Sequence, residues 1–169
     1  MKRVIRRNVW ETNSSSSHTV SIRGKSVIDT SYNSCVTNLG IIKVTLGEYG
    51  WSGPTCYSFE DKLAYALSMV LHTEYPGFDH WDDNFVIDDE IMSELNGYKM
   101  ICDAIKHRMG DNFKSIVINR DYGEYPYGYI DHQSCYYNSL QDFLDDWHVD
   151  IDKYLFDESV SVYIDNDNH

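Results

Sequence analysis

The sequence predicts an α+β fold in a single globular domain, residues 1–169, with a mainly antiparallel sheet packed against two to three helices. Segments with helical periodicity and segments rich in β-branched residues both occur, and they do not alternate strictly along the chain. No repeat or linker divides the 169 residues, and a chain of this length buries roughly 70% of its unfolded surface. One hydrophobic core is therefore expected.

Strands are expected where β-branched and aromatic residues cluster between turn residues. The first strand runs from Arg3 to Trp10, and a second strand, His18 to Arg23, returns after a polar run. Because strands and helices do not alternate strictly, antiparallel pairing is expected. The other strand predictions are residues 41–46, 115–119, 127–130 and 160–164.

The clearest helix is predicted over about residues 59–73. Ser58 is its N-cap, and Asp61 completes a capping box three residues later. A continuous apolar stripe indicates that this helix is largely buried. The stripe consists of Phe59, Leu63, Leu67, Val70 and Leu71.

Two further helices are predicted. One covers about residues 89–109, with acids in its first turns, basic residues in its last turn and Gly110 as its stop. Gly97 marks a possible break inside it. The last helix runs from Ser139 to about Trp147.

Composition excludes several classes of protein. With 27 acidic and 14 basic residues, the net charge is −13, which excludes binding of free nucleic acid or anionic membranes by bulk charge. No apolar run has the roughly 18 residues of a membrane helix, and no signal peptide is recognised, so a cytoplasmic location is expected. The four cysteines are far apart in sequence and are expected to be reduced thiols.

The negative charge is segregated along the chain. Residues 1–25 carry a net charge of +5, and the remaining 144 residues carry −18. Residues 79–94 hold seven acids without Lys or Arg, and residues 142–169 hold nine acids with Lys153 as the sole base. Such stretches are either solvated faces or surfaces that dock on a basic partner. The candidate partner-binding residues are Asp82, Asp83, Asp88, Asp89, Asp145 and Asp146.

Three polar clusters follow strand-like segments, at residues 11–18, 131–134 and 165–169. Side chains at strand ends stand on a rigid scaffold beside loops, where binding and catalytic groups tend to lie. If the three strands are neighbours, the clusters converge on one rim. The candidate ligand-binding residues are Asn13, Ser14, Ser15, Ser16, Ser17, Gln133 and Ser134.

The histidines and acids of these clusters suggest chemistry. His18 is a candidate acid or base beside the serine hydroxyls, and Asp131 and His132 are further catalytic candidates. Asp165, Asp167 and His169 alternate, so an extended chain would present two carboxylates and a histidine to one divalent cation, the cofactor that the sequence suggests. The competing interpretations are a solvated serine loop, a buried structural His132 and a frayed terminus.

A run of tyrosines, Tyr122, Tyr125, Tyr127 and Tyr129, could stack nucleic-acid bases or pack against a partner. Packing in the core and in turns is the simpler interpretation, because Arg120 alone supplies positive charge nearby.

Several blocks of the sequence resemble a family of small proteins from bacteriophages and related mobile elements. The resemblance implies a setting, the infected bacterial cytoplasm, in which many small acidic proteins block host defence. It supplies no catalytic residues. The blocks are residues 7–18 (RNVWETNSSSSH), 47–51 (GEYGW), 130–134 (IDHQS) and 164–168 (IDNDN).

Two functional hypotheses follow. The first is an anti-CRISPR-like inhibitor, an acidic protein that occupies the basic nucleic-acid groove of a host defence nuclease or its nucleoprotein complex. The alternative is a phosphodiester- or nucleotide-acting enzyme, similar to a ribonuclease or phosphodiesterase, that uses His18, the serine run, Asp131 and His132. Both hold if the site cuts nucleic acid only when docked on a partner.

Overall fold

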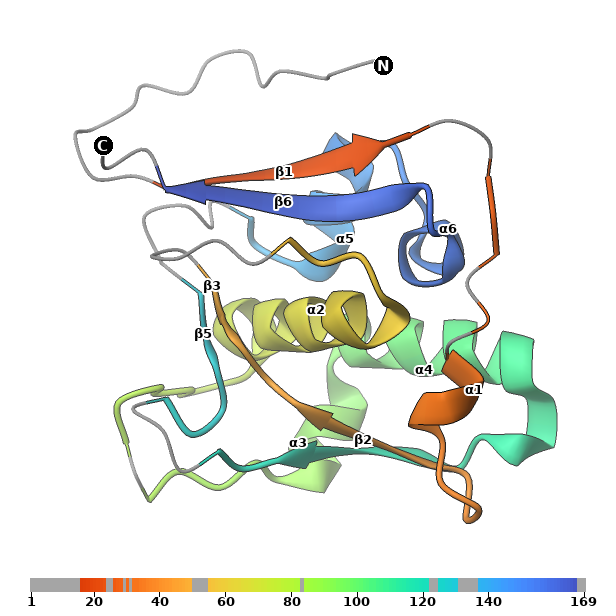
Figure 1. Cartoon of the computed structure of the whole chain (residues 1–169). Coiled ribbons are helices and arrows are strands. Elements are labelled where there is room, and N and C mark those ends of the chain that lie inside the picture. The colour runs from red at the N-terminus through yellow and green to blue at the C-terminus, as the bar shows by residue number, and fades with distance from the viewer. Residues whose placement is uncertain are drawn as a thin grey trace.

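The computed structural model describes residues 16–23, 26–28, 30, 32–49, 55–82, 84–121, 125–130 and 137–166. Helices and strands are mixed without strict alternation, as predicted for an α+β protein (Figure 1). In chain order the elements are β1 (Ser16–Ile22), α1 (Tyr32–Cys35), β2 (Ile41–Thr45), β3 (Glu48–Tyr49), α2 (Phe59–Glu74), α3 (Asp89–Glu94), α4 (Asn96–Met109), the 3-10 helix η1 (Gly110–Asn112), β4 (Ser115–Asn119), β5 (Tyr129–Ile130), α5 (Leu140–Asp146), α6 (Ile151–Phe156) and β6 (Val160–Asn166).

Helix α2 lies at the centre of the fold, between the β1–β6 ribbon and the β2–β4 pair (Figure 1). The predicted capping box is present: the Ser58 hydroxyl accepts the Asp61 N–H at 3.1 Å, and the Asp61 carboxylate accepts the Ser58 N–H at 3.3 Å. Phe59 and every residue from Lys62 to Leu71 are buried. Because other elements surround α2, its burial extends beyond the single stripe expected from sequence.

The prediction of a mainly antiparallel sheet is wrong. In the described residues β1 and β6 pair antiparallel, whereas β2–β4 and β3–β5 are parallel pairs. The chain between β2 and β4 is about 70 residues long and contains α2, α3 and α4. A long helical crossover of this kind permits parallel pairing, which a short hairpin loop does not.

A glycine brings β5 against the end of β2. Gly128 has a φ of +74°, and a Cβ atom there would lie 2.7 Å from Leu46 Cβ and 2.8 Å from the Gly47 carbonyl oxygen. The Tyr129 N–H donates to that same carbonyl at 3.1 Å. Only glycine permits both the dihedral and the close approach. This contact fixes the position of Tyr129 beside α2.

The helix predicted over residues 89–109 is two helices, α3 and α4, separated at Leu95. The break falls two residues before Gly97, where a weak point was expected. The Glu74 carboxylate, at the end of α2, accepts the Gly97 N–H at 2.9 Å and the Leu140 N–H at 3.3 Å. These N–H groups lie in the first turns of α4 and α5, where no intrahelical acceptor is available. A tertiary contact thus fixes the start of both helices.

The number of helices differs from the expectation. The described residues contain six α-helices rather than two or three, because the helix predicted over residues 89–109 is two helices and because α1 and α6 have too few residues to show a helical period. The Asp150 carboxylate caps α6 by accepting the Lys153 N–H at 2.7 Å. The strand expected from Arg3 to Trp10 lies outside the described residues.

Two expectations from composition agree with the structure. Cys56 and Cys102 are free thiols, while Cys135 lies outside the described residues. Among the helices of the described part of the chain, none has the length and apolar character needed to cross a bilayer.

Replacing Gly97 with alanine should destabilise the protein by about 1–3 kcal/mol, although alanine is the better helix former. Its Cβ would lie 2.6 Å from both Glu74 Oε1 and Val70 Cγ2. Urea unfolding measures the effect, and the exposed Asp103→Ala change in α4 is the control for helix propensity. A Gly97→Ala variant at least as stable as the wild type would contradict the close packing.

Candidate functional site

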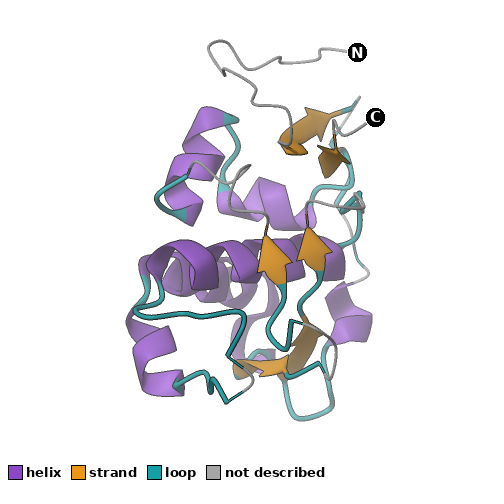
Figure 2. Ribbon diagram, turned by 90° about the vertical axis from the view of Figure 1, so that its left-hand side faces the viewer, coloured by secondary structure: helices purple, strands orange, loops and turns teal. Residues whose placement is uncertain are grey.

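The strand-end clusters come together in part. In the β1–β6 ribbon, Ser17 lies opposite Asp165 and Ser16 opposite Asn166, so the first and third clusters share one end of the ribbon. His18 lies opposite Ile164. In Figures 1 and 2, β5 runs toward the side of the molecule where this end lies. The register therefore pairs the described residues of the first and third clusters, 16–18 and 165–166, within the strands β1 and β6 rather than in loops after them.

The other candidate residues of these clusters lie outside the described part of the chain: Asn13, Ser14, Ser15, Asp131, His132, Gln133, Ser134 and Asp167. The catalytic role of His18, Asp131 and His132 stays a prediction, as does the cation site at Asp165 and Asp167. Where side chains are described, no three His, Cys, Asp or Glu residues are grouped to hold a metal ion.

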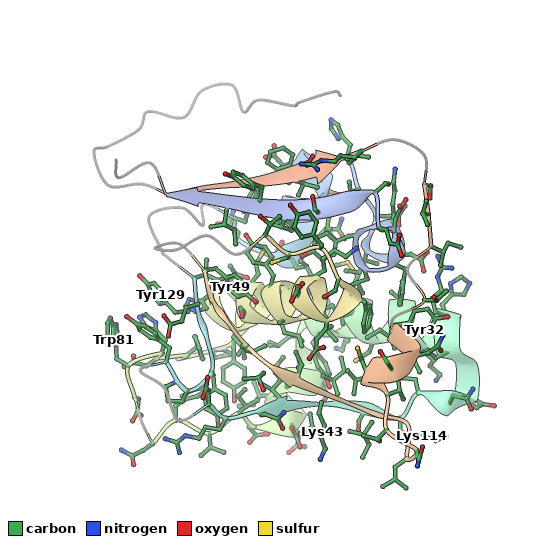
Figure 3. All side chains as sticks on the ribbon, viewed as in Figure 1. Tyr32, Lys43, Tyr49, Trp81, Lys114 and Tyr129 are labelled. Carbon is green, nitrogen blue, oxygen red and sulfur yellow. The ribbon has the colours of Figure 1, made fainter. Side chains whose placement is uncertain are left out.

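A second constellation lies where α2, the loop after it and the turn before β5 meet. We call it the aromatic cluster. The Tyr125 and Tyr129 rings are stacked with centroids 4.7 Å apart. The Trp81 ring lies 5.1 Å from that of Tyr125 and 5.0 Å from that of His80. Figure 3 shows Trp81 at the outer edge of the molecule and Tyr129 next to it on the inner side. The aromatic cluster consists of His72, Phe78, His80, Trp81, Tyr125 and Tyr129.

The inner end of the aromatic cluster is a neutral histidine. His72 Nε2 accepts the Ile130 N–H at 3.3 Å, which requires that this nitrogen carries no proton. Burial, and after it the charge of His80, lower the pKa of His72 to about 4, although a hydrogen bond with the Gly128 backbone acts in the opposite direction. The His72 ring also packs edge-on against Phe78 at 4.9 Å. His72 therefore connects α2 to β5 and is uncharged at neutral pH.

The outer end is exposed and is held by local hydrogen bonds. Trp81 is 60% exposed, whereas Tyr129 is buried. The Asp79 carboxylate accepts the Trp81 N–H at 2.9 Å, and the Asp82 carboxylate accepts the Asn84 N–H at 2.8 Å. Such short-range aspartate contacts shape turns without regular secondary structure. The loop thus carries an exposed aromatic side chain with an exposed aspartate close to it in sequence on either side.

The acidic segment 79–94 continues from this loop into α3. Its described acids are exposed, and no Lys or Arg lies among them. Large apolar side chains are exposed in the same segment: Trp81, Val86 and Ile91. Besides Asp79 and Asp82, two further acids have local partners: Asp88 caps α3 by accepting the Glu90 N–H at 2.8 Å, and Glu94 pairs with Lys99 at 3.1 Å. The segment is thus an acidic surface with apolar side chains distributed along it. The described acids are Asp79, Asp82, Asp88, Asp89, Glu90 and Glu94.

In the second acidic segment, residues 142–169, several aspartates accept hydrogen bonds from other parts of the fold. Asp145 accepts from the Gln141 amide at 2.6 Å, and Asp146 accepts from the Tyr137 hydroxyl at 3.0 Å. Asp152 accepts two hydrogen bonds from the Arg108 guanidinium group, at 3.1 and 2.5 Å. Asp145 and Asp146 are nevertheless exposed, as are Asp82, Asp88 and Asp89, so all five stay candidates for partner binding, while Asp83 lies outside the described residues.

Asp157 is the clearest structural acid of the second segment. Burial alone would raise its pKa, but hydrogen bonds from Ser26, Ser159 and the Val27 backbone outweigh burial and lower the pKa well below its ordinary value. The Ser26 hydroxyl donates to the carboxylate at 2.6 Å. This carboxylate holds the chain after β1 against the turn before β6.

Sequence reasoning identified the tyrosines of the aromatic cluster but not its histidines or Trp81. The cluster joins residues 72–81 to residues 125–129, and no local spacing relates segments that far apart. Tyr125 and Tyr129 were expected to stack bases or to pack in turns, and they pack against each other and against His80. The sole signal in the sequence was the Asp-His-Trp-Asp run at residues 79–82.

Comparisons with known proteins find no family model, no curated protein and no solved structure that matches this chain. The functional argument therefore rests on the residues themselves.

The depressed pKa of His72 has a consequence for stability. The folded pKa of about 4 lies below the unfolded value of 6.5, so the unfolded chain binds more protons between these values. Stability should rise with pH across that window, by a His72 contribution on the order of 3 kcal/mol. Urea unfolding from pH 4 to 6.5 should show a shallower rise for His72→Gln than for the wild type. A change at the exposed His148, His148→Asn, is the control, and equal slopes for His72→Gln and wild type would contradict the assignment.

Proposed function

We propose that the protein is an acidic inhibitor that docks on the basic nucleic-acid-binding surface of a partner protein, and that segment 79–94 is its docking face. The observation that carries the proposal is the combination of exposed acids, absence of Lys and Arg, and exposed apolar side chains in that segment. Acidic groups speed association with a basic partner and orient it. Apolar and aromatic side chains supply the affinity that charge alone does not.

The net charge of −13 favours a protein partner over free nucleic acid, because a protein this acidic repels phosphates. The same charge suits a groove that otherwise holds DNA or RNA. The resemblance to proteins of bacteriophages and mobile elements favours a host defence nuclease as that partner, in the bacterial cytoplasm.

Enzymatic action on a phosphodiester or nucleotide is a second candidate function. The observation in its favour is the backbone register of β1 and β6, which puts Ser17 opposite Asp165; His18 follows Ser17, lies opposite Ile164 and belongs to the other face of the ribbon. Hydroxyls, a carboxylate and a histidine at one strand end are groups that can bind phosphate and transfer a proton.

Removing charge from segment 79–94 should abolish inhibition. The test uses purified RNA- or DNA-guided defence nucleases and their target cleavage assay, with wild-type protein and an Asp82→Asn, Asp89→Asn, Glu90→Gln variant. Asp82→Asn retains the oxygen that accepts the Asn84 N–H, so the turn is preserved while charge is lost. Inhibition by the wild type should weaken as salt rises, because screening at 0.1 M salt acts over about 10 Å.

The matched control for this experiment carries Asp103→Asn, Asp111→Asn and Asp142→Asn, which remove the same charge from exposed positions elsewhere. The control should inhibit as the wild type does. Absence of inhibition and of binding by the wild type at low salt, across the nucleases tested, would overturn the proposed function. Equal inhibition by both triple variants would show that segment 79–94 is not the docking face.

The enzymatic candidate has a separate test. His18→Ala and His132→Ala should each lower turnover of RNA, cyclic dinucleotides or NAD about 10²–10⁴-fold if these residues transfer protons. Assays run with and without Mg²⁺ or Mn²⁺, and thermal unfolding of each variant is measured alongside. Absence of turnover by the wild type, together with early melting of His132→Ala, would show that His132 is structural.

A further inference from the structure

The outer face of the aromatic cluster combines a flat apolar ring with adjacent negative charge. Trp81 is 60% exposed, and its inner side packs against Tyr125 and His80. Asp79 and Asp82, on either side of Trp81 in the loop, are exposed carboxylates fixed in turns. Figure 3 places Trp81 at the edge of the molecule. An aromatic face bordered by carboxylates is suited to one class of ligand, a flat organic cation.

We propose that this face binds an arginine side chain of the basic partner, with the guanidinium plane against the Trp81 ring and its N–H groups toward Asp79 and Asp82. The inference rests on the proposed function, because it names the chemical group of the partner that segment 79–94 recognises. It adds that recognition depends on a ring stack as well as on net charge.

Arginine fits the site better than the alternatives. A nucleobase could also stack on Trp81, but its phosphate would lie beside two carboxylates without a lysine or arginine in residues 79–94 to neutralise it. A lysine ammonium group is a compact, strongly hydrated charge, whereas the guanidinium group is planar, weakly hydrated and able to stack. Its fork of N–H donors also matches a carboxylate in two hydrogen bonds.

The site is built before any ligand arrives. Trp81 packs on Tyr125, which stacks on buried Tyr129, so the outer ring has a support that reaches the core. Asp79 Oδ1 accepts the hydrogen bond from the Trp81 backbone N–H. A carboxylate has about four acceptor positions, so others on Asp79 are left for a ligand. Both features reduce the ordering that binding would otherwise require.

The experiment uses the full chain, labelled with ¹⁵N, and two probes of equal length and charge, nona-arginine and nona-lysine peptides. The indole N–H signal of Trp81, identified by its loss in Trp81→Phe, should shift with nona-arginine and much less with nona-lysine. Trp81→Ala should weaken nona-arginine binding about 3- to 30-fold, the range expected for loss of a cation–π contact. Tyr57→Ala, which removes another exposed aromatic ring, is the matched control and should bind as the wild type does.

The two proposals fail differently. If Trp81→Ala binds nona-arginine as tightly as the wild type, or if both peptides bind equally and shift Trp81 equally, the arginine site is overturned. The docking function then stands or falls with the Asp82, Asp89 and Glu90 triple variant, which should weaken binding of both peptides. If a single-stranded oligonucleotide shifts Trp81 and the peptides do not, the arginine site is overturned in favour of base stacking.

Discussion

The buried ammonium group of Lys62 is the contact on which the arrangement of the fold depends. Lys62 lies within α2 and is fully buried, and its Nζ donates to the carbonyl oxygens of Asp157 and Val160 at 3.0 and 3.4 Å. A buried charge without such partners costs several kcal/mol. The segment between α6 and β6 must therefore lie against α2, and the Tyr154 hydroxyl strengthens the contact by donating to the Lys62 carbonyl at 3.1 Å. Since β6 begins at Val160, the position of the whole β1–β6 ribbon follows from this contact.

At the other end of α2 the ionisable side chain is a carboxylate, that of Glu74, and it too is hydrogen-bonded to the backbone of other elements. Glu74 accepts backbone N–H groups from the first turns of α4 and α5, so each end of the central helix satisfies an ionisable side chain with the backbone of other elements. His72 lies two residues earlier and joins α2 to β5 through the Ile130 N–H. The aromatic cluster is thus attached to the most constrained part of the molecule, which explains how an exposed ring such as Trp81 can be held in one orientation.

Local signals predicted the local structure well. The capping box at Ser58, the apolar stripe of α2 and the β-branched run of β2 depend on neighbouring residues, and all three are present. Parallel pairing and the aromatic cluster depend on residues that are distant in sequence, and no periodicity reports such contacts. The break at Leu95 falls between these cases, because Gly97 signalled weakness but the Glu74 carboxylate determines where α4 starts. The described residues of the first and third polar clusters lie within β1 and β6 rather than in loops after strands, and the β1–β6 register pairs them, which no local pattern could have shown.

Because β1 pairs with β6, the first strand cannot pair until nearly the whole chain has been synthesised on the ribosome. Ile22, at the end of β1, pairs with Val160, the first residue of β6. At the usual elongation rate of about 5–20 residues per second, roughly 7 to 28 seconds pass between the synthesis of Ile22 and that of Val160. During that interval the edge of β1 has no partner strand and is open to pairing with another chain. Charge repulsion between acidic chains opposes such pairing until β6 is synthesised. The net charge of −13 therefore also favours solubility during synthesis.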